Sequence, residues 1–577
     1  MKQQVKQVPY GVSDFATVMS QNLYYVDKTM FLPELEKQPR NLFFIRPRRF
    51  GKSIFLSMLY SYYDCNQKES FEKLFGNLWI GQHPTSLQGI YQVLFLDFSQ
   101  ITGKIEVLEE RFNAYLCIKL DSFAEQYAAY YGDKKVQEIK TKTQYADKMQ
   151  IIFDAAKANH FQLYLIIDEY DNFTNVVLNE HGEKVYHAIT HADGFYRDVF
   201  KKFKGNFERI FMMGVSPVTL DDVTSGYNVG WNISVKPEFD EMLGFSTKDV
   251  VEMFTYYKEM GSIPADSDVE AIVNDMKPWY DNYCFADERY GETTMYNSVM
   301  VLNFVDNYIR SEYQIPKKMV ETNIRIDYDK MRMLIRHDKE FAHDASIIQQ
   351  LVTQGFVTGT LNENFPAERI NDPDNFLSLL FYFGMVTIDG TYKGETKFII
   401  PNEVVRDQMY TYLLDTYKEN DLVYDRYSKG KLESKLAYDG QFKPYFEYIA
   451  DCLKKYSSQR DKQKGEAFVH GFTLAMTSQN KFYRPISELD NDGGYADIFL
   501  SPLCDIYKDM VDSYIIELKY CKSQTTDEQV KKLFEEASAQ ISRYADSDMV
   551  REAVKTTKLH KLVVIYRGAE MVGCEEI

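Results

Sequence analysis

Long apolar segments are what this sequence most clearly lacks. No window approaches the roughly 18 uninterrupted apolar residues that a membrane-spanning helix needs. The first fifteen residues carry two lysines and no apolar core, which is unlike a signal peptide. We therefore expect a cytoplasmic protein that has no membrane partner.

Cysteine, glycine, proline and positive charge are also limited. The seven cysteines are scattered, with no CxxC pair and no Cys/His cluster, so the sequence supports neither a structural zinc site nor a disulfide framework. Only 29 glycines and 16 prolines occur in 577 residues, and no repeat or low-complexity linker is visible. The 67 Lys and Arg residues against 85 Asp and Glu give a net charge of 67 − 85 = −18. This acidity disfavours non-specific adhesion to nucleic acid, so any such contact needs a local patch.

Core-forming residues, by contrast, are plentiful. Hydrophobic residues make up 45% of the chain and aromatic residues 15%, which excludes a disordered or collagen-like protein. The length predicts about three or four domains. Four short apolar runs in the first half read as buried strands separated by helices: Leu42–Ile45, Val93–Asp97, Tyr164–Ile167 and Ile210–Met213. The intervening helical patterns are Ser53–Tyr63, Ile105–Tyr130 and Tyr145–Asn159. Strands that are apolar on both faces predict an α/β fold with a parallel sheet covered on both sides.

The pattern becomes helical from about Thr247 onward, with helices expected at Thr247–Met260, Asp268–Trp279 and Asn297–Ser311. A later apolar helix, Phe376–Phe383, precedes two short strands that flank a turn at Asp389-Gly390, which predicts a winged-helix-like unit. The last part reads as a helix, two strands, a helix and a strand: Glu466–Thr477, Ala496–Leu500, Tyr514–Leu518, Asp527–Tyr544 and Lys561–Ile565.

A phosphate-binding loop follows the first strand. The string Arg46-Pro47-Arg48-Arg49-Phe50-Gly51-Lys52-Ser53 lies between that strand and an apolar-faced helix, which is the layout of a P-loop. Backbone N–H groups at a helix start attract an anion. We expect Lys52 to reach the β- and γ-phosphates of ATP and Ser53 to bind Mg²⁺. Arg46 stands where the usual GxxxxGK[ST] pattern has its first glycine.

The third strand ends in two carboxylates, Asp168 and Glu169. In P-loop NTPases an Asp at this position holds Mg²⁺, and an adjacent Glu can polarise the attacking water. Ser216, after the fourth strand, could sense the γ-phosphate, although a simple turn is nearly as good an explanation. Both motifs in the expected order favour a nucleotide-hydrolysing site.

Five sequence strings now suggest a family. They are Tyr10–Phe15, Tyr25–Thr29, Arg46–Ser53, Gly214–Pro217 and Ser225–Asn228. Together they resemble the bacterial AAA-ATPase-like proteins, which commonly carry a C-terminal PD-(D/E)XK nuclease-superfamily domain. In that family the string Arg46–Ser53 is the normal form of the P-loop. The resemblance implies ATP binding by Arg48, Arg49, Phe50, Gly51, Lys52, Ser53, Asp168 and Ser216, and points toward defence or mobile-element biology.

A second group of charged residues lies near the C-terminus. Asp497 begins one apolar strand, and Glu517 and Lys519 end the next. Because residues i and i+2 of a strand point to the same side, these three side chains can share one site. Two carboxylates suit Mg²⁺ or Mn²⁺, and the lysine can orient water or stabilise charge. The pattern resembles the D…ExK signature of PD-(D/E)XK nucleases. The resemblance implies that Glu466, on the preceding helix, is an extra acidic metal ligand. The residue before Asp497 is Ala496, where the signature usually has Pro.

These features predict four domains. They are an AAA-like P-loop ATPase core (1–240), a helical lid (241–335), a helical, winged-helix-like middle domain (336–430) and a nuclease-like, restriction-endonuclease-type α/β domain (431–577). The leading hypothesis is an ATPase coupled to a metal-dependent nuclease, for which DNA is favoured over RNA but the choice between them is left open. The alternative is an ATP-dependent switch or remodelling ATPase whose nuclease-like domain only binds a partner. The sequence leaves open whether the chain assembles into a homo-oligomer.

Histidines offer one further pattern. His187 and His191 are four residues apart, as a helical metal-binding pair would be. No cysteine lies nearby and no glutamate stands between them, so a polar loop or a solvated helix face is the preferred interpretation.

Overall fold

The computed structural model describes residues 4–191, 194–219, 230–316, 319, 347–370, 372–419, 422–457, 465–491, 494–504, 506–544 and 548–577. The string Ser225–Asn228 lies outside them. The chain forms two compact units. The N-terminal unit is Met1–Pro316 with Gly359–Asn402, and the C-terminal unit is Lys317–Thr358 with Glu403–Ile577. The four-domain division stays a prediction.

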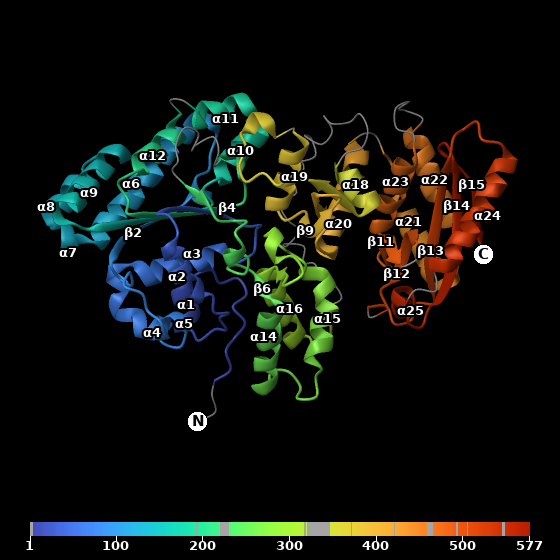
Figure 1. The fold of residues 1–577 in the computed structure, drawn as a ribbon, viewed down its shortest axis with the longest axis horizontal. Helices are drawn as coiled ribbons and strands as arrows, with labels where there is room; N and C mark the ends of the chain where they lie inside the picture. Colours follow the sequence, from blue (N-terminus) through green and yellow to red (C-terminus); the bar gives the residue numbers. More distant parts are fainter. Residues whose placement is uncertain are drawn as a thin grey trace. The chain divides into compact units, whose positions relative to one another are not determined.

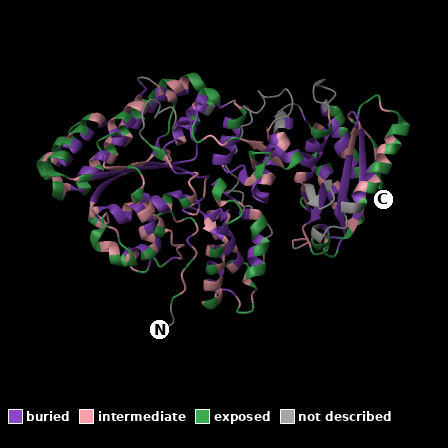
Figure 2. Cartoon of the chain, in the orientation of Figure 1, coloured by how far each residue is buried: buried purple, intermediate pink, exposed green. Residues whose placement is uncertain are grey.

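A parallel sheet organises the N-terminal unit. Its strands are β1 (Asn41–Ile45), β2 (Tyr91–Asp97), β3 (Gln162–Asp168), β4 (Arg209–Gly214) and β5 (Trp231–Asn232), in the order β2-β3-β4-β1-β5. All the neighbouring strands run parallel, with Phe43 beside Met212 and Ile166 beside Phe211. Strands β1 to β4 are largely buried (Figure 2), whereas Trp231 of the short edge strand β5 is half-exposed. The four predicted strands and the parallel α/β fold are therefore confirmed.

Helices cover both faces of this sheet. Figure 1 shows α3 on one face and α6 and α9 on the other. The helices up to the end of β4 are α1 (Phe15–Ser20), α2 (Leu32–Lys37), α3 (Lys52–Tyr63), α4 (Phe71–Phe75), α5 (Trp79–Gln82), α6 (Leu108–Gln126), α7 (Ala128–Tyr131), α8 (Asp133–Lys140), α9 (Tyr145–Asn159), α10 (Asn172–His181), α11 (Glu183–Thr190) and α12 (Phe195–Phe203).

The single helix predicted for Ile105–Tyr130 is interrupted. The structure has a 3₁₀ turn at Ile105–Val107, then α6, and α7 after a break at Tyr127. The buried hydroxyl of Tyr127 donates to Asp64 Oδ2 (2.9 Å) and accepts from the Val93 backbone N–H (2.7 Å). These hydrogen bonds to residues distant in sequence fix Tyr127 at the point where α6 ends. No local sequence pattern predicts them.

The helices predicted after Thr247 are present as α14 (Thr247–Glu259), α15 (Val269–Tyr280) and α16 (Ser298–Arg310), with a short antiparallel pair, β6 (Phe245–Ser246) and β7 (Met295–Tyr296). Ser246 and Asp249 form a reciprocal capping box that fixes the start of α14.

The predicted helix–hairpin unit also exists, as α19 (Pro373–Tyr382), β9 (Thr387–Tyr392) and β10 (Glu395–Ile399). The turn expected at Asp389-Gly390 is wrong: β9 runs through both residues, and the chain reverses at Lys393-Gly394. Those two residues have φ of 54° and 92°, which is the left-handed backbone that a tight two-residue hairpin requires.

The C-terminal unit contains a mixed sheet, β11 (Tyr483–Asn491), β12 (Gly494–Pro502), β13 (Asp512–Cys521), β14 (Lys558–Arg567) and β15 (Glu570–Glu576), in that order. Only β13 and β14 are parallel. The predicted strands correspond to β12, β13 and β14, whereas β11 and β15 were not predicted.

Helices of the C-terminal unit are α18 (Ile347–Gln354), α20 (Glu403–Glu419), α21 (Arg426–Asp439), α22 (Lys443–Ser457), α23 (Glu466–Ser478), α24 (Asp527–Tyr544) and α25 (Asp548–Val554). Figure 1 shows α24 on one side of the sheet and α21 and α23 on the other. Phe499, Ile515, Ile541 and Val550 form part of the core on the α24 side. Among the described residues, none of the helices combines the length and apolar character needed to cross a lipid bilayer.

Candidate functional sites

The loop between β1 and α3 has the backbone expected of an anion-binding loop. Arg49 and Gly51 have φ of 70° and 88°, in the left-handed region. Gly51 is the N-cap of α3, and its carbonyl accepts the first helical hydrogen bond, from Phe55 N (3.2 Å). The free N–H groups and the positive end of the α3 dipole therefore lie at this loop.

Lys52 is held inside the loop rather than in solvent. Its side chain is buried, and Nζ donates to the carbonyl oxygens of Arg46 (3.0 Å) and Pro47 (2.8 Å). Burial lowers the pKa of Lys52 to about 8, against the opposing effect of Asp168 and other nearby carboxylates. The Lys52 ammonium thus donates only to neutral carbonyl oxygens in the described structure. A phosphate could take their place and would form stronger hydrogen bonds, because it is negatively charged.

Ser53 and Asp168 meet as expected. The Ser53 hydroxyl donates to Asp168 Oδ2 (2.6 Å), and the backbone N–H of Glu169 donates to Oδ1 (3.0 Å). Burial raises the pKa of Asp168 to about 6, although the Ser53 hydrogen bond and the charge of Lys52 act in the opposite direction. A hydroxyl and a carboxylate at this distance fit the oxygen ligands of Mg²⁺.

Glu169 and Ser216 occupy the same edge of the sheet, because β4 lies between β3 and β1 and all three run parallel. Glu169 has φ of 50°, a backbone conformation that is uncommon for a residue with a side chain. Ser216 is buried, and its Oγ accepts from the Val218 backbone N–H (3.3 Å). The catalytic role of Glu169 and the phosphate-sensing role of Ser216 stay predictions.

The second predicted site is assembled on two neighbouring antiparallel strands of the C-terminal unit. Asp497 on β12 accepts a hydrogen bond from the Leu518 backbone N–H of β13 through Oδ2 (2.7 Å). Glu517 and Lys519 of β13 form an ion pair, with Nζ 2.7 Å from Oε1. The predicted grouping of these three side chains is therefore present in the structure.

Glu517 has the feature that best indicates a cation. Its side chain is 2% exposed, and Oε2 has no hydrogen-bond partner among the described residues. Burial raises its pKa to about 7, with the charge of Asp497 adding to the effect and Lys519 opposing it. A buried carboxylate oxygen with no partner is costly, and a divalent cation would compensate for it.

Helix α23 adds two more residues to this site. Glu466 lies exposed in its first turn, and its charge contributes to the raised pKa of Glu517. His470, one turn later and buried, donates from Nε2 to the backbone carbonyl of Asp497 (2.9 Å). Sequence reasoning missed His470, although its position four residues after Glu466 on a predicted helix was an available signal.

Two family models match the parts of the chain in which these two groups of residues lie. Residues 9–224, which contain Lys52 and Asp168, match a family model described as a predicted AAA-ATPase. Residues 464–576, which contain Asp497, Glu517 and Lys519, match the model of the PD-(D/E)XK nuclease superfamily. The chain joins an AAA-ATPase-like domain to a PD-(D/E)XK nuclease-superfamily domain. Both parts of the resemblance drawn from the sequence strings are confirmed.

Individual relatives are distant. An uncharacterized protein in the vnfD 5′ region of Azotobacter chroococcum mcd 1 is 25% identical over 296 residues, which are 49% of each protein. The chain therefore spans about half the length of this curated relative. The solved structure of the Aeropyrum pernix ORC2 protein in ADPNP–ADP complexes is 11% identical, with a TM-score of 0.31 over 67% of this chain and 93% of that one.

In the AAA-ATPase-like domain, Asp171 is a further residue that sequence reasoning missed. It is buried, and its two carboxylate oxygens accept from the Val215 backbone N–H (3.3 and 3.1 Å) and from Asn175 Nδ2 (2.8 Å). A side chain at Gly214 would collide with it, because a Cβ there would lie 2.6 Å from Asp171 Oδ1. Asp171 thus links the carboxyl ends of β3 and β4 through its bonds to the backbone of Val215.

Arg46 explains how the domain does without the first glycine of the usual P-loop pattern. Its guanidinium is buried and donates to the carbonyl oxygens of Ile45 (3.1 Å), Ser234 (2.5 Å) and Phe239 (3.1 Å). It also lies over the rings of Phe44 and Phe285, 4.2 and 4.0 Å from the centroids. Arg46 therefore anchors the loop entry through the buried carbonyls of Ser234 and Phe239, and its guanidinium is not a phosphate ligand.

This role predicts a large stability effect. Replacing Arg46 with methionine should destabilise the N-terminal unit by about 3 kcal/mol, because buried carbonyls lose a charged donor. Arg46→Lys should not restore the wild-type value, since one ammonium cannot reproduce the planar fork between two rings. Urea unfolding monitored by circular dichroism measures both. Arg40→Met, a change at an exposed pair with Glu208, is the control; equal midpoints for the Arg46 and Arg40 variants would contradict the role.

The start of α16 also contacts the phosphate loop. Asn297 Nδ2 donates to the Arg48 carbonyl (3.2 Å), and Ser298 Oγ donates to the Arg49 carbonyl (3.1 Å). Asn297 simultaneously caps α16 by accepting from Met300 N (3.3 Å). The predicted loop residues Arg48 and Arg49 are thus fixed through their backbone by a helix that is remote in sequence.

Proposed function

We propose that this protein hydrolyses ATP at the loop Arg46–Ser53 and cleaves nucleic-acid phosphodiester bonds at Asp497, Glu517 and Lys519. The ATPase half rests on the hydrogen bond between Ser53 and Asp168 beside the buried Lys52. These three residues would hold the nucleotide phosphates and the Mg²⁺, while Glu169 would accept a proton from the attacking water.

The nuclease half rests on one observation, the buried and unpartnered Oε2 of Glu517 next to Asp497. Bound Mg²⁺ or Mn²⁺ would supply an activated water and neutralise phosphate charge. Asp497 and Glu517 would be its ligands, with Glu466 as an outer carboxylate. Lys519 already neutralises Glu517 and would orient the phosphate or the water.

His470 would act in this proposal as a positioning residue. Burial lowers the pKa of His470, which favours the neutral ring, and its N–H holds the Asp497 carbonyl. The bond fixes the backbone of β12 at the residue that supplies the metal ligand.

We infer that ATP turnover controls cleavage, because one chain carries both sites. DNA is the substrate we propose, with RNA as the alternative that the test separates from it. The test is cleavage of labelled plasmid, single-stranded DNA and RNA in Mg²⁺ or Mn²⁺, with ATP, with a non-hydrolysable analogue and without nucleotide. Metal-dependent cleavage of DNA that changes at least severalfold with ATP is the expected result. Cleavage of RNA alone would reject the DNA assignment, and cleavage indifferent to nucleotide would reject the coupling.

Absence of cleavage on every substrate, with ATPase activity intact, would favour the switch or remodelling function instead. A role in defence or in mobile elements belongs to the same proposal. It predicts that cells carrying the wild-type gene, but not the Lys52→Ala variant, change the efficiency of phage plating or plasmid transfer.

A further inference from the structure

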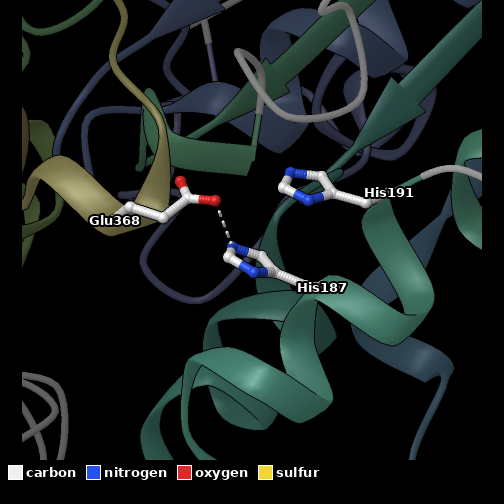
Figure 3. A group of neighbouring side chains, drawn as sticks. All are labelled: His187, His191 and Glu368. Atoms are coloured by element: carbon white, nitrogen blue, oxygen red, sulfur yellow. Dashed lines mark ion pairs between the residues drawn. The ribbon is translucent and has the colours of Figure 1, made fainter.

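Three side chains outside both sites come together in the N-terminal unit. His187 lies on α11, His191 follows the end of that helix, and Glu368 belongs to a 3₁₀ turn at Ala367–Arg369. Figure 3 shows the two imidazoles side by side with the Glu368 carboxylate reaching toward them. One ligand atom from each residue lies within 4.8 Å of the other two. The sequence suggested only a polar loop or a solvated helix face for the two histidines. The structure adds Glu368, which comes from a segment far along the chain.

The geometry within the group is tight. His187 Nε2 lies 3.0 Å from a Glu368 carboxylate oxygen, and the two histidine rings stack with centroids 4.1 Å apart. His191 is the extended residue directly after α11, and its ring stacks on the ring of His187 in the last turn of that helix. His187 Nε2 is inaccessible to solvent and, despite its proximity to Glu368, is not aligned for a hydrogen bond with any described residue.

These ligand types indicate a particular class of ion. Two imidazoles and one carboxylate are a common protein ligand set for Zn²⁺, with bonds of about 2.0–2.2 Å and the fourth position open to water. In a tetrahedral site with bonds of that length, two ligand atoms lie about 3.3 Å apart. The distance between His187 Nε2 and the Glu368 carboxylate oxygen, 3.0 Å, is close to this value. Mg²⁺ and Ca²⁺ favour oxygen ligands and do not suit a pair of imidazoles.

We propose that His187, His191 and Glu368 bind one divalent transition-metal ion, with Zn²⁺ as the preferred ion. Glu183 would be an outer partner, since its carboxylate lies 4.0 Å from His187 Nδ1 and can orient that ring. The ion would be separate from those of the ATPase and nuclease sites.

Such an ion would join two parts of the N-terminal unit. Helix α11 follows the strand that carries Asp168, whereas Glu368 belongs to the segment Gly359–Asn402. The same segment reaches the phosphate loop, because a Cβ on Gly384 would lie 2.7 Å from Pro47. The ion would therefore hold Gly359–Asn402 in place against the ATPase-like domain.

The test is Zn²⁺ binding by the full chain carrying Glu517→Gln, which weakens the proposed nuclease-site metal binding. Competition with a chromophoric chelator measures affinity, and Zn X-ray absorption identifies the ligands. We expect one tightly bound Zn²⁺ with nitrogen and oxygen ligands and no sulfur. His187→Ala, His191→Ala and Glu368→Gln should each weaken Zn²⁺ binding by at least about tenfold. Loss of a residue that only supports a metal ligand already costs about ten- to a hundredfold in affinity, and loss of a ligand should cost no less.

His181→Ala, at the exposed end of α10, is the matched control and should bind as the parent does. Glu368→Gln changes a half-exposed side chain, so it carries the test if a histidine variant fails to fold. A parent protein that takes up no Zn²⁺, sulfur ligands in the absorption spectrum, or unchanged affinity in folded variants would each overturn the proposal. The group would then be a histidine–glutamate ion pair only.

Discussion

Lys52→Ala should lower ATP turnover by on the order of a thousandfold, because it removes the ammonium that we propose neutralises the β- and γ-phosphates as charge develops. The side chain is buried and bonded only to carbonyls of its own loop, so alanine removes charge without breaking an ion pair in the described structure. Glu169→Gln should instead keep ATP affinity and slow hydrolysis, since the amide cannot accept the proton of the attacking water.

Phosphate release measured under saturating ATP, together with binding of a fluorescent ATP analogue, separates the two variants. Lys37→Ala is the control, because this exposed lysine on α2 forms an ion pair with Glu34 on the same helix. If Lys52→Ala turned over ATP at the wild-type rate, the loop Arg46–Ser53 would not be the nucleotide site.

Asp497→Ala and Glu517→Ala should each reduce nucleic-acid cleavage by on the order of a thousandfold, because each removes a proposed ligand of the metal that stabilises the transition state. Lys519→Ala should impair cleavage strongly while metal binding persists, since an ammonium is not a ligand. Loss of Lys519 also removes the partner of Glu517 Oε1 and one of the groups that lower the pKa of Glu517, so wild type and variant are compared over a pH series rather than at one pH.

Initial cleavage rates and Mn²⁺ affinity, measured on the same preparations, distinguish ligand loss from loss of the lysine. Glu570→Gln, at an exposed pair with Lys454 in the same unit, is the control. All these variants should keep wild-type ATP hydrolysis. Wild-type cleavage by Asp497→Ala would exclude this site as the nuclease centre, and loss of ATPase activity in all three would point to a folding defect instead.

Residues adjacent in sequence gave the most reliable predictions. The strings ending at Ser53 and at Glu169 each follow an apolar strand, and parallel strands bring their carboxyl ends to one edge. The contact between Ser53 and Asp168 was therefore predictable. The pairing of Asp497 with Glu517 followed from the alternation of side chains along two neighbouring strands.

Residues whose partners are distant in sequence were not predictable in the same way. The turn placed at Asp389-Gly390 is wrong because a glycine with positive φ can lie within a strand as well as at a turn. Arg46 departs from the usual loop pattern, and only its carbonyl partners at Ser234 and Phe239 explain why.

The sequence by itself determined the parallel α/β fold, the phosphate loop with its acidic partner, and the carboxylate–lysine group near the C-terminus, because each depends on short-range order and strand periodicity. Only the tertiary structure decided which residues support these sites and which lie close together elsewhere. The contacts are the hydrogen bonds of Arg46 to buried carbonyls, of Asn297 to the Arg48 carbonyl and of His470 to the Asp497 carbonyl, and the close approach of His187 to Glu368. Three of these contacts join elements that lie far apart along the chain, and the bond from His470 joins helix α23 to strand β12, 27 residues later. The geometry of each contact is set by the packing of whole helices and strands rather than by local sequence.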